Sequence, residues 1–546
     1  MTATTELPAS PEVEVRDSWT PMIVIAMGQA LMSFNVAAIP VSMGGMVESF
    51  GAPPTTVGTA IVLYSLGVSG FIMLGSKLGQ RFGSKIFFQA AAGLFGVAML
   101  LMTISPTAEI MLLAQALAGL AGAALVPTLV VLIANHYRGK QQAEAVGLLG
   151  SARAIAGVLA FTIVGTVATL LSWRFAFGLL IVHAAAILYL STKLKPAASK
   201  PEVGIDVVGV ILAALALITM IFGFNNIRNW GLLVAGPSAP FNVAGMSPAP
   251  IMIVAGALLG AAFFVWTHRR VAASQTPLLA PEVVDEPTEW ASVIALFTIV
   301  GMEGAINFSV PLYIQIVQAS SAFQTSIVMM PFMLTVFFTA ILIVRLYAKF
   351  TPRTIARGAF VLVAIGTAWL AFVVKNDWST LPVIAGLITV GLGQGALVTL
   401  LFNVLVTSAG KELAGDVGSL RGVTQNLAAA VGTSLVGAML VGLLTSIILG
   451  KLSDNPVITA ELKDEANLTN LNFMSDAQLR DRLKTTAATP EQFDEALRIN
   501  GEARTQALKI GFLVLSCLSL LALIPCGWLP PYRPGELPAG AVAKPS

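Results

Sequence analysis

The stretch S-K-L-G-Q-R-F-G-S-K at Ser76–Lys85 is a short basic segment between two long apolar runs. A related segment, V-R-L-Y-A-K-F-T-P-R, occupies Val344–Arg353. Both copies follow the order basic, Leu, two residues, basic, Phe, two residues, basic. The repeat predicts a duplicated helical hairpin, and therefore a chain built from two similar halves.

The composition around these segments indicates a membrane protein. Of the 546 residues, 56% are hydrophobic and only 11% are charged, whereas roughly a quarter of the residues in a soluble domain are charged. A helix needs about 20 apolar residues to cross the hydrocarbon core, and the chain offers many such runs. We expect an all-α polytopic membrane protein in a lipid bilayer. The net charge of +3 gives no reason to expect nucleic acid as a partner.

The apolar runs predict about fourteen transmembrane helices in the order six, two, six. They are expected near 20–41, 57–76, 86–105, 109–134, 144–171, 174–192, 206–224, 250–267, 290–316, 325–346, 356–374, 381–407, 418–449 and 509–529. The domains expected from them are a tail at 1–19, a six-helix bundle at 20–192, a linker with two helices at 193–289, a second six-helix bundle at 290–529 that includes an extracytoplasmic loop at 450–508, and a tail at 530–546.

Basic residues in short loops predict the orientation, because Lys and Arg resist translocation. One side carries Lys77, Arg81, Lys85, Arg138, Lys140, Lys193, Lys195, Arg269, Arg270, Arg345, Lys349, Arg353 and Lys411. The short loops on the other side contain few Lys or Arg residues. We therefore expect the first side and both termini to be cytoplasmic, in the inner or plasma membrane of a cell.

Neither an enzyme nor a metal site is expected. The two cysteines, Cys517 and Cys526, lie in one apolar run without the spacing of a zinc site. The three histidines are far apart and belong to no recognisable catalytic motif.

Three motifs carry a resemblance to a known family. Ser76–Lys85 resembles a G-x-L-a-D-R-x-G-R-K loop between a second and a third helix, and Ser172–Phe177 resembles an S-W-R-x-x-F junction. Pro311–Gln315, followed by Ser321, Ala322 and Pro331, is similar to a third junction. Together with the two-helix insert, these motifs resemble the major facilitator superfamily, and more narrowly its fourteen-span drug:proton antiporter branch.

The resemblance implies the major facilitator fold, in which two six-helix bundles rock around a substrate site near the membrane midplane. The basic segments would then serve as cytoplasmic gate loops, whose cations meet helix carbonyl ends or acids of the facing bundle. The alternative is that they only mark topology. The gate residues expected are Lys77, Gln80, Arg81, Gly83, Lys85, Arg345, Lys349 and Arg353.

Several polar positions of the family pattern differ here. The acid of the first motif is Gln80, the fourth-helix Arg falls on Gln115, and the fifth-helix Pro falls near Phe161. Leu31 stands about where a proton-binding Asp is common. The coupling residue must therefore be sought elsewhere in the chain.

Glu303 is the acid best placed to carry protons, because charge inside a membrane is costly and usually functional. It lies about 13 residues into its expected helix, near the midplane at about 1.5 Å per residue. Asn307, one turn on, shares its face. The alternative is a neutral Glu held in helix packing.

Other polar residues within the spans are candidates for the substrate cavity. Arg153 would bind an anionic group or extend to the cytoplasmic interface, and the amides would contact substrate or join helices. The cavity candidates are Gln29, Asn35, Arg153, Asn307, Gln315, Gln394, Asn403, Arg421, Gln425 and Asn426.

These features favour a secondary active transporter that exports amphipathic, drug-like small molecules by proton antiport. It would need no cofactor besides an ion gradient and would act as a monomer. Three alternatives stay open: an uncoupled facilitator, a narrow-substrate exporter of a lipid or metabolite, and a membrane sensor or scaffold that transports nothing.

The polar segment Gly450–Ala507 gives a first testable prediction. It is either an extension of the last two helices or a cap and partner-docking surface over the outer mouth. Within it, Ser475–Leu483 and Thr489–Leu508 are expected to be helical. If the segment is a mere extension, deleting Asn467–Thr486 leaves the export rate of intact cells unchanged. Loss of export at normal membrane expression favours the cap or docking surface.

Overall fold

The structure is a computed structural model that describes residues 17–51, 54–196, 199–318, 322–375, 380–409, 413–453, 455–458, 476–484 and 489–533. Fourteen of its helices are long and apolar enough to cross a membrane. Their bounds, with those of the shorter helix α15, are α1 Thr20–Phe50, α2 Pro54–Phe82, α3 Ser84–Ile104, α4 Ala108–His136, α5 Gly139–Leu170, α6 Trp173–Ser191, α7 Val207–Trp230, α8 Pro248–Ala272, α9 Pro287–Leu312, α10 Ala322–Leu346, α11 Pro352–Val373, α12 Thr380–Ala409, α13 Ala414–Ser453, α15 Asp476–Leu483 and α16 Pro490–Leu521.

Local sequence sets several helix ends. Gly83 has a φ of 88° between α2 and α3, a left-handed conformation that glycine adopts without strain. The Thr351 hydroxyl accepts a hydrogen bond from the Thr354 amide at the start of α11. Thr489 and Gln492 form a capping box at the start of α16, with Pro490 in its first turn. The predicted start of this helix is thus confirmed.

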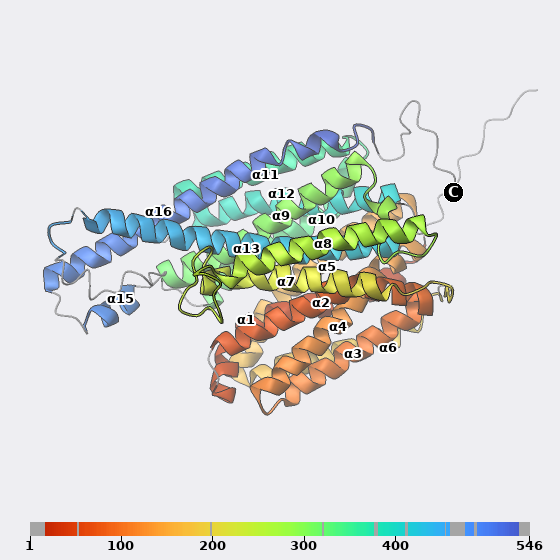
Figure 1. The fold of residues 1–546 in the computed structure, drawn as a ribbon, viewed down its shortest axis with the longest axis horizontal. Coiled ribbons are helices and arrows are strands. Elements are labelled where there is room, and N and C mark those ends of the chain that lie inside the picture. The colour runs from red at the N-terminus through yellow and green to blue at the C-terminus, as the bar shows by residue number, and fades with distance from the viewer. Residues whose placement is uncertain are drawn as a thin grey trace, which may run out of the picture.

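The helices form two bundles and an inserted pair, as predicted (Figure 1). The first bundle contains α1–α6, and the second contains α9–α13 and α16. The inserted helices α7 and α8 pack against each other, and α7 contacts both α2 and α13. The side chain of Ile218 on α7 reaches within 3.0 Å of the space that a Cβ at Gly70 would fill. The insert therefore lies along the seam between the bundles.

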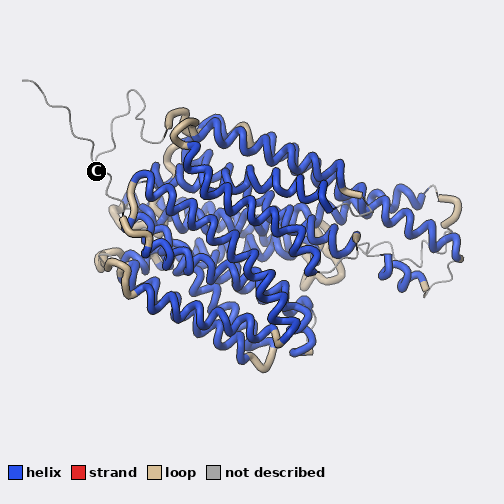
Figure 2. The backbone as a smooth tube through the Cα atoms, turned by 180° about the vertical axis from the view of Figure 1, so that it is seen from behind, coloured by secondary structure: helices blue, strands red, loops and turns tan. Residues whose placement is uncertain are grey.

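The bundles approach each other at one end, which we call the basic end because Lys77, Lys85 and Arg345 lie there. A Cβ at Gly418 of α13 would lie 2.9 Å from the Cα of Pro127 on α4. One at Gly147 of α5 would lie 2.7 Å from the carbonyl oxygen of Ala340 on α10. Away from this end the axes of the two bundles diverge (Figures 1 and 2).

The last two long helices differ from expectation. α13 ends only at Ser453, and α16 joins the expected loop helix 489–508 and the last expected span into one helix of 32 residues. No proline interrupts 491–521, so the helix continues. Both helices project beyond the bundle, where α15 lies beside them (Figures 1 and 2). The Arg504 guanidinium binds the Asp476 carboxylate of α15 at 2.6 Å. Residues 459–475 and 485–488 of the expected loop lie outside the described residues.

Close approach of α9 and α13 gives a second prediction. A methyl group at Gly432 would overlap the carbonyl of Gly301, whereas one at Gly442 of the same helix would meet nothing within 4 Å. We expect Gly432→Ala to destabilise the protein by about 1–3 kcal/mol, because the backbone must shift to relieve the overlap.

The measurement is the thermal unfolding midpoint of the detergent-purified protein. Gly442→Ala is the matched control and should unfold at or slightly above the wild-type temperature, since Ala is favoured over Gly in helices by about 0.5–1 kcal/mol. Equal midpoints for the two variants would contradict the packing described.

Candidate functional site

A buried ion pair joins the two bundles at the basic end. Lys77 Nζ of α2 lies 2.9 Å from Asp416 Oδ2 of α13, with the side chains only 5% and 2% exposed. The Ser76 hydroxyl is 3.5 Å from Asp416 Oδ1, and the Ala280 amide donates to Oδ2 at 3.0 Å. Asp416 is also in the first turn of α13, where the helix dipole favours a negative charge. The carboxylate therefore holds together α2, α13 and the segment that follows α8.

A cavity of about 530 Å³ lies beside this pair. Its walls come from the ends of α2, α8 and α13 and from the segment between α8 and α9, including Lys77, Gln80, Gln275, Glu282 and Asp416. The Gln80 amide nitrogen lies 3.1 Å from the space that a Cβ at Gly415 would fill. This cavity is thus part of the closed basic end and does not lie between the bundles at mid-membrane.

The other basic residues of the repeated segments divide into two groups. Lys85 donates to the carbonyls of Thr192 and Leu194 at 2.8 and 2.7 Å, after the end of α6. Arg353 donates to the carbonyl of Leu529 at 3.0 Å, beyond α16. In both halves, therefore, a cation in the third helix binds carbonyls after the sixth. For Arg81, Arg345 and Lys349, no ion pair is formed with any residue that the structure describes.

A second ion pair joins the bundles further along the helices. Arg153 Nη2 of α5 lies 3.1 Å from Glu303 Oε1 of α9. The Arg153 side chain is 36% exposed and that of Glu303 14%, so the pair is partly open to the space between the bundles. Asn307, one turn beyond Glu303, is exposed. The predicted proton-carrying acid and a predicted cavity cation thus bind each other directly.

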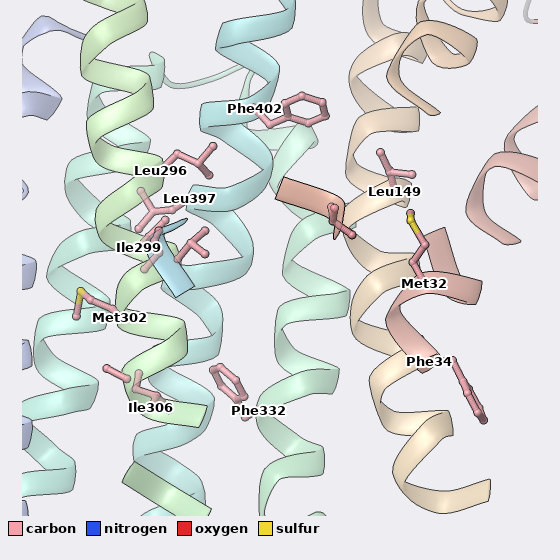
Figure 3. Packing of buried hydrophobic residues seen from close by; sticks show 14 of the residues in the cluster. Met32, Phe34, Leu149, Leu296, Ile299, Met302, Ile306, Phe332, Leu397 and Phe402 are labelled. Atoms are coloured by element: carbon pink, nitrogen blue, oxygen red, sulfur yellow. The ribbon is translucent and has the colours of Figure 1, made fainter. Parts of the chain in front are cut away.

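Arg421 lies near this pair but is buried. The positive charge of Arg153 acts on the Arg421 guanidinium, whose carbon lies 4.1 Å from the centre of the Phe402 ring. Phe402 projects from α12 towards the helix that carries Leu149 (Figure 3). Arg421 Nε and Gln425 Nε2, one turn apart on α13, are both buried without a hydrogen-bond partner.

The remaining cavity candidates have mixed surroundings. Asn35 and Gln115 exchange two hydrogen bonds of 2.9 and 3.1 Å between α1 and α4, an interhelical contact that uses both amides. Asn403 is 3.4 Å from the Tyr347 hydroxyl and 3.5 Å from the Ala143 carbonyl, at the basic end. The side chains of Asn35 and Asn403 are therefore both held by contacts with other protein groups.

The other amides show local contacts. Gln29 donates to Ser33 on its own helix, and Asn426 donates to the carbonyl of Gly422. The Gln394 side-chain oxygen is buried without a partner. The side chain of Gln315 lies outside the described residues.

Sequence reasoning missed two residues of this arrangement. Asp416 closes the basic end, and its signal was an acid two residues before the predicted start of a helix at 418. Phe402 supports Arg421, but an aromatic residue in an apolar span carries no signal of its own. Among the residues that the structure describes, no group of three or more His, Cys, Asp or Glu side chains gathers as a metal site would require.

Comparison with known proteins places the chain among membrane transporters. The family model of the Major Facilitator Superfamily matches residues 25–433. The multidrug efflux pump LfrA of Mycolicibacterium smegmatis is 24% identical over 425 residues, which cover 77% of this chain and 81% of that one. The puromycin resistance protein pur8 of Streptomyces alboniger is 24% identical over 81% of this chain and 86% of its own. The solved structure of the proton:xylose symporter XylE shares the fold, with a TM-score of 0.54, 11% identity and coverage of 93% and 94% of the two chains.

The pair at the basic end gives a third prediction. Asp416→Ala leaves Lys77 buried without a counter-ion, which typically costs about 3–5 kcal/mol. We expect this variant to populate a state with the basic end open. Spin labels at Phe82 and Phe350, exposed residues at the basic ends of the two bundles, should then show an added population of longer distances in electron paramagnetic resonance.

Asp206→Ala is the matched control for this measurement. Asp206 is equally buried, but its carboxylate binds Trp266 and Arg270 within the inserted pair. Its loss should leave the label distances unchanged. A wild-type distance distribution in Asp416→Ala would mean that the ion pair does not hold this end closed.

Proposed function

Because this chain belongs to the major facilitator superfamily and is therefore an integral membrane transporter, not an enzyme, we propose that it exports amphipathic small molecules in exchange for protons. The multidrug efflux pump and the puromycin resistance protein among its relatives support an exporter of drug-like compounds. The driving force is an ion gradient, for which we propose protons. We further propose that the transporter acts as a monomer and that a partner protein, if one binds, docks at the extracytoplasmic segment 450–508.

The orientation follows from the charges. The basic end faces the cytoplasm, because Lys and Arg in short loops stay on that side. The two bundles contact each other there, through the ion pair of Lys77 and Asp416 and through Gly147 and Gly418. In this conformation the path to the cytoplasm is closed and the bundles diverge towards the outside. With this proposed orientation, we infer that the described conformation is the outward-facing one.

The observation that carries the proposal is the ion pair of Arg153 and Glu303. Each partner belongs to a different bundle, so the pair favours the conformation in which α5 and α9 are close. A proton on Glu303 removes its negative charge and leaves Arg153 without a counter-ion. At an effective dielectric constant of 20, the attraction of such a pair is on the order of 4 kcal/mol, and less where water reaches it. Protonation from the outside would therefore release one bundle from the other.

The route of the proton is short in this conformation. Glu303 is partly exposed and Asn307 lies exposed one turn towards the outer end of α9. An amide accepts or donates a hydrogen bond, so Asn307 suits both the charged and the neutral form of Glu303. The charged group that contacts Glu303 within the described residues is its partner Arg153.

A fourth prediction tests the coupling. Glu303→Gln keeps the shape of the side chain but cannot gain or lose a proton near neutral pH, so we expect uphill export of fluorescent drugs from cells to fall at least about tenfold. Downhill movement of the same drugs in proteoliposomes should continue. Uphill export is measured with and without a proton uncoupler.

Glu109→Gln is the control, since Glu109 is an exposed carboxylate at the far end of α4. It should export as the wild type does. Uphill export by Glu303→Gln would place the coupling group elsewhere. Wild-type export that resists the uncoupler would favour the uncoupled facilitator, and no movement of any tested compound would favour the sensor.

A further inference from the structure

The starting observation is a buried cation without an acidic partner. Arg421 is 4% exposed, and it forms no ion pair or hydrogen bond with any residue that the structure describes. Its Nε is buried and unsatisfied. Leaving a buried guanidinium without a counter-ion is costly, because nothing within the described residues compensates for the lost hydration of its Nε.

The surroundings of Arg421 prepare it to bind a ligand. The Phe402 ring covers one face of the guanidinium at 4.1 Å, which fixes its plane by a cation–π contact. A ring offers no charge to neutralise it, so the N–H groups keep their capacity to donate. Gln425, one turn further on the same helix, adds a second buried donor without a partner, Nε2. A ligand group that accepts hydrogen bonds would satisfy both of these donors on one helix face.

The charge balance between the bundles is also positive. Lys77 and Asp416 neutralise each other at the basic end, and Glu303 is matched by Arg153. α12, which supports Arg421 through Phe402, contains no charged residue. The acids of α4 and α9 other than Glu303 are Glu109 and Glu289, at the outer end of α4 and in the first turn of α9. Among the residues that the structure describes, Arg421 thus leaves one positive charge between the bundles without an ion-pair partner.

Access to Arg421 comes from the basic end. Arg421 is the eighth residue of α13, about 10 Å from its start at 1.5 Å per residue. Its neighbours Gly418 and Gly422 form the face of α13 that packs against Pro127 and Ile72 of the first bundle. When the basic end opens, these contacts separate and the same face meets the cytoplasm. A ligand that reaches Arg421 therefore comes from the side on which an exporter collects its substrate.

We propose that the substrate of this transporter is an amphipathic anion whose carboxylate or phosphate group binds Arg421, with Gln425 as a second donor. Arg421 forms charge-assisted hydrogen bonds to the anion, and the apolar part of the molecule lies between the bundles. This inference rests on the proposed export function and makes Arg421 the residue that selects for charge. The same chemistry occurs in free organic acids and in anionic lipids.

The test compares two probes that differ in charge and by one methyl group: dansyl-aminoundecanoic acid and its methyl ester. Binding of each to the full chain in phosphatidylcholine nanodiscs is followed by dansyl fluorescence. We expect the acid to bind at least about tenfold more tightly than the ester, the effect of one hydrogen bond to a charged group. Arg421→Gln should remove this preference without weakening the ester, and Arg421→Lys should keep part of it.

Arg269→Gln is the matched control, because it removes an exposed Arg at the end of α8, in the inserted pair. It should keep the full preference for the acid. Equal binding of acid and ester by the wild type overturns the inference, and so does an unchanged preference in Arg421→Gln. If Arg421→Gln fails to give a monodisperse protein, the comparison of wild type with Arg421→Lys decides: an equal preference in both, or none in the wild type, overturns the inference.

Two further arms separate the possible outcomes. Adding phosphatidylglycerol to the nanodiscs displaces the acid if an anionic lipid is the natural ligand and leaves it bound if a free organic acid is. Export of the ester and the acid from cells tests the proposed function independently. Transport of the ester that depends on Glu303, without any preference for the acid, would uphold the export function and overturn the inference about charge.

Discussion

Charges that lie away from water dictate how the two halves of this protein meet. A lone ion in a membrane protein interior is costly, and a close counter-ion offsets much of that cost. In the described structure the partners come from opposite bundles: Lys77 with Asp416 and Arg153 with Glu303. The same constraint that stabilises each pair therefore determines which conformation the bundles adopt. Separating the bundles requires a new partner, a proton or water for each charge.

The two ion pairs differ in how deeply they are buried. The pair at the basic end is almost fully buried and also binds the Ala280 amide, so it acts as a closed contact between α2, α13 and the segment before α9. The pair of Arg153 and Glu303 is partly exposed. The second pair therefore meets solvent in the described conformation, whereas the first is closed off from it.

The inserted helices take part in this arrangement. α7 lies along the seam and contacts both bundles, and the segment that leaves α8 supplies the amide that binds Asp416. Asp206 anchors the insert internally through Trp266 and Arg270. The insert is thus connected to the buried ion pair through the backbone of its own exit segment.

The pseudo-symmetry of the halves is incomplete in an informative way. Lys85 and Arg353 bind equivalent carbonyls after the sixth helix of each half. Lys77 has an acidic partner, whereas Arg345, at the matching position of the second copy, forms no ion pair within the described part of the chain. Within the described residues, only one of the two duplicated hairpins therefore contributes an ion pair at the basic end. The sequence repeat predicted equivalent positions, and packing made them unequal.

The sequence alone determined the number of spans, their order and the duplicated hairpin, because hydropathy and basic segments act locally. It also identified Glu303 and Arg153 as the charges to examine, since either is conspicuous in an apolar helix. Tertiary structure decided which polar groups pair with one another. Lys77 and Asp416 are 339 positions apart in the sequence, and Asn35 binds Gln115 across 80 positions. The tertiary structure likewise decided that Arg421 lies on Phe402 without an ion pair to any described residue and that 490–521 is one helix. Pairing between distant helices depends on the packing of whole bundles, and no local pattern of residues records which polar groups that packing brings together.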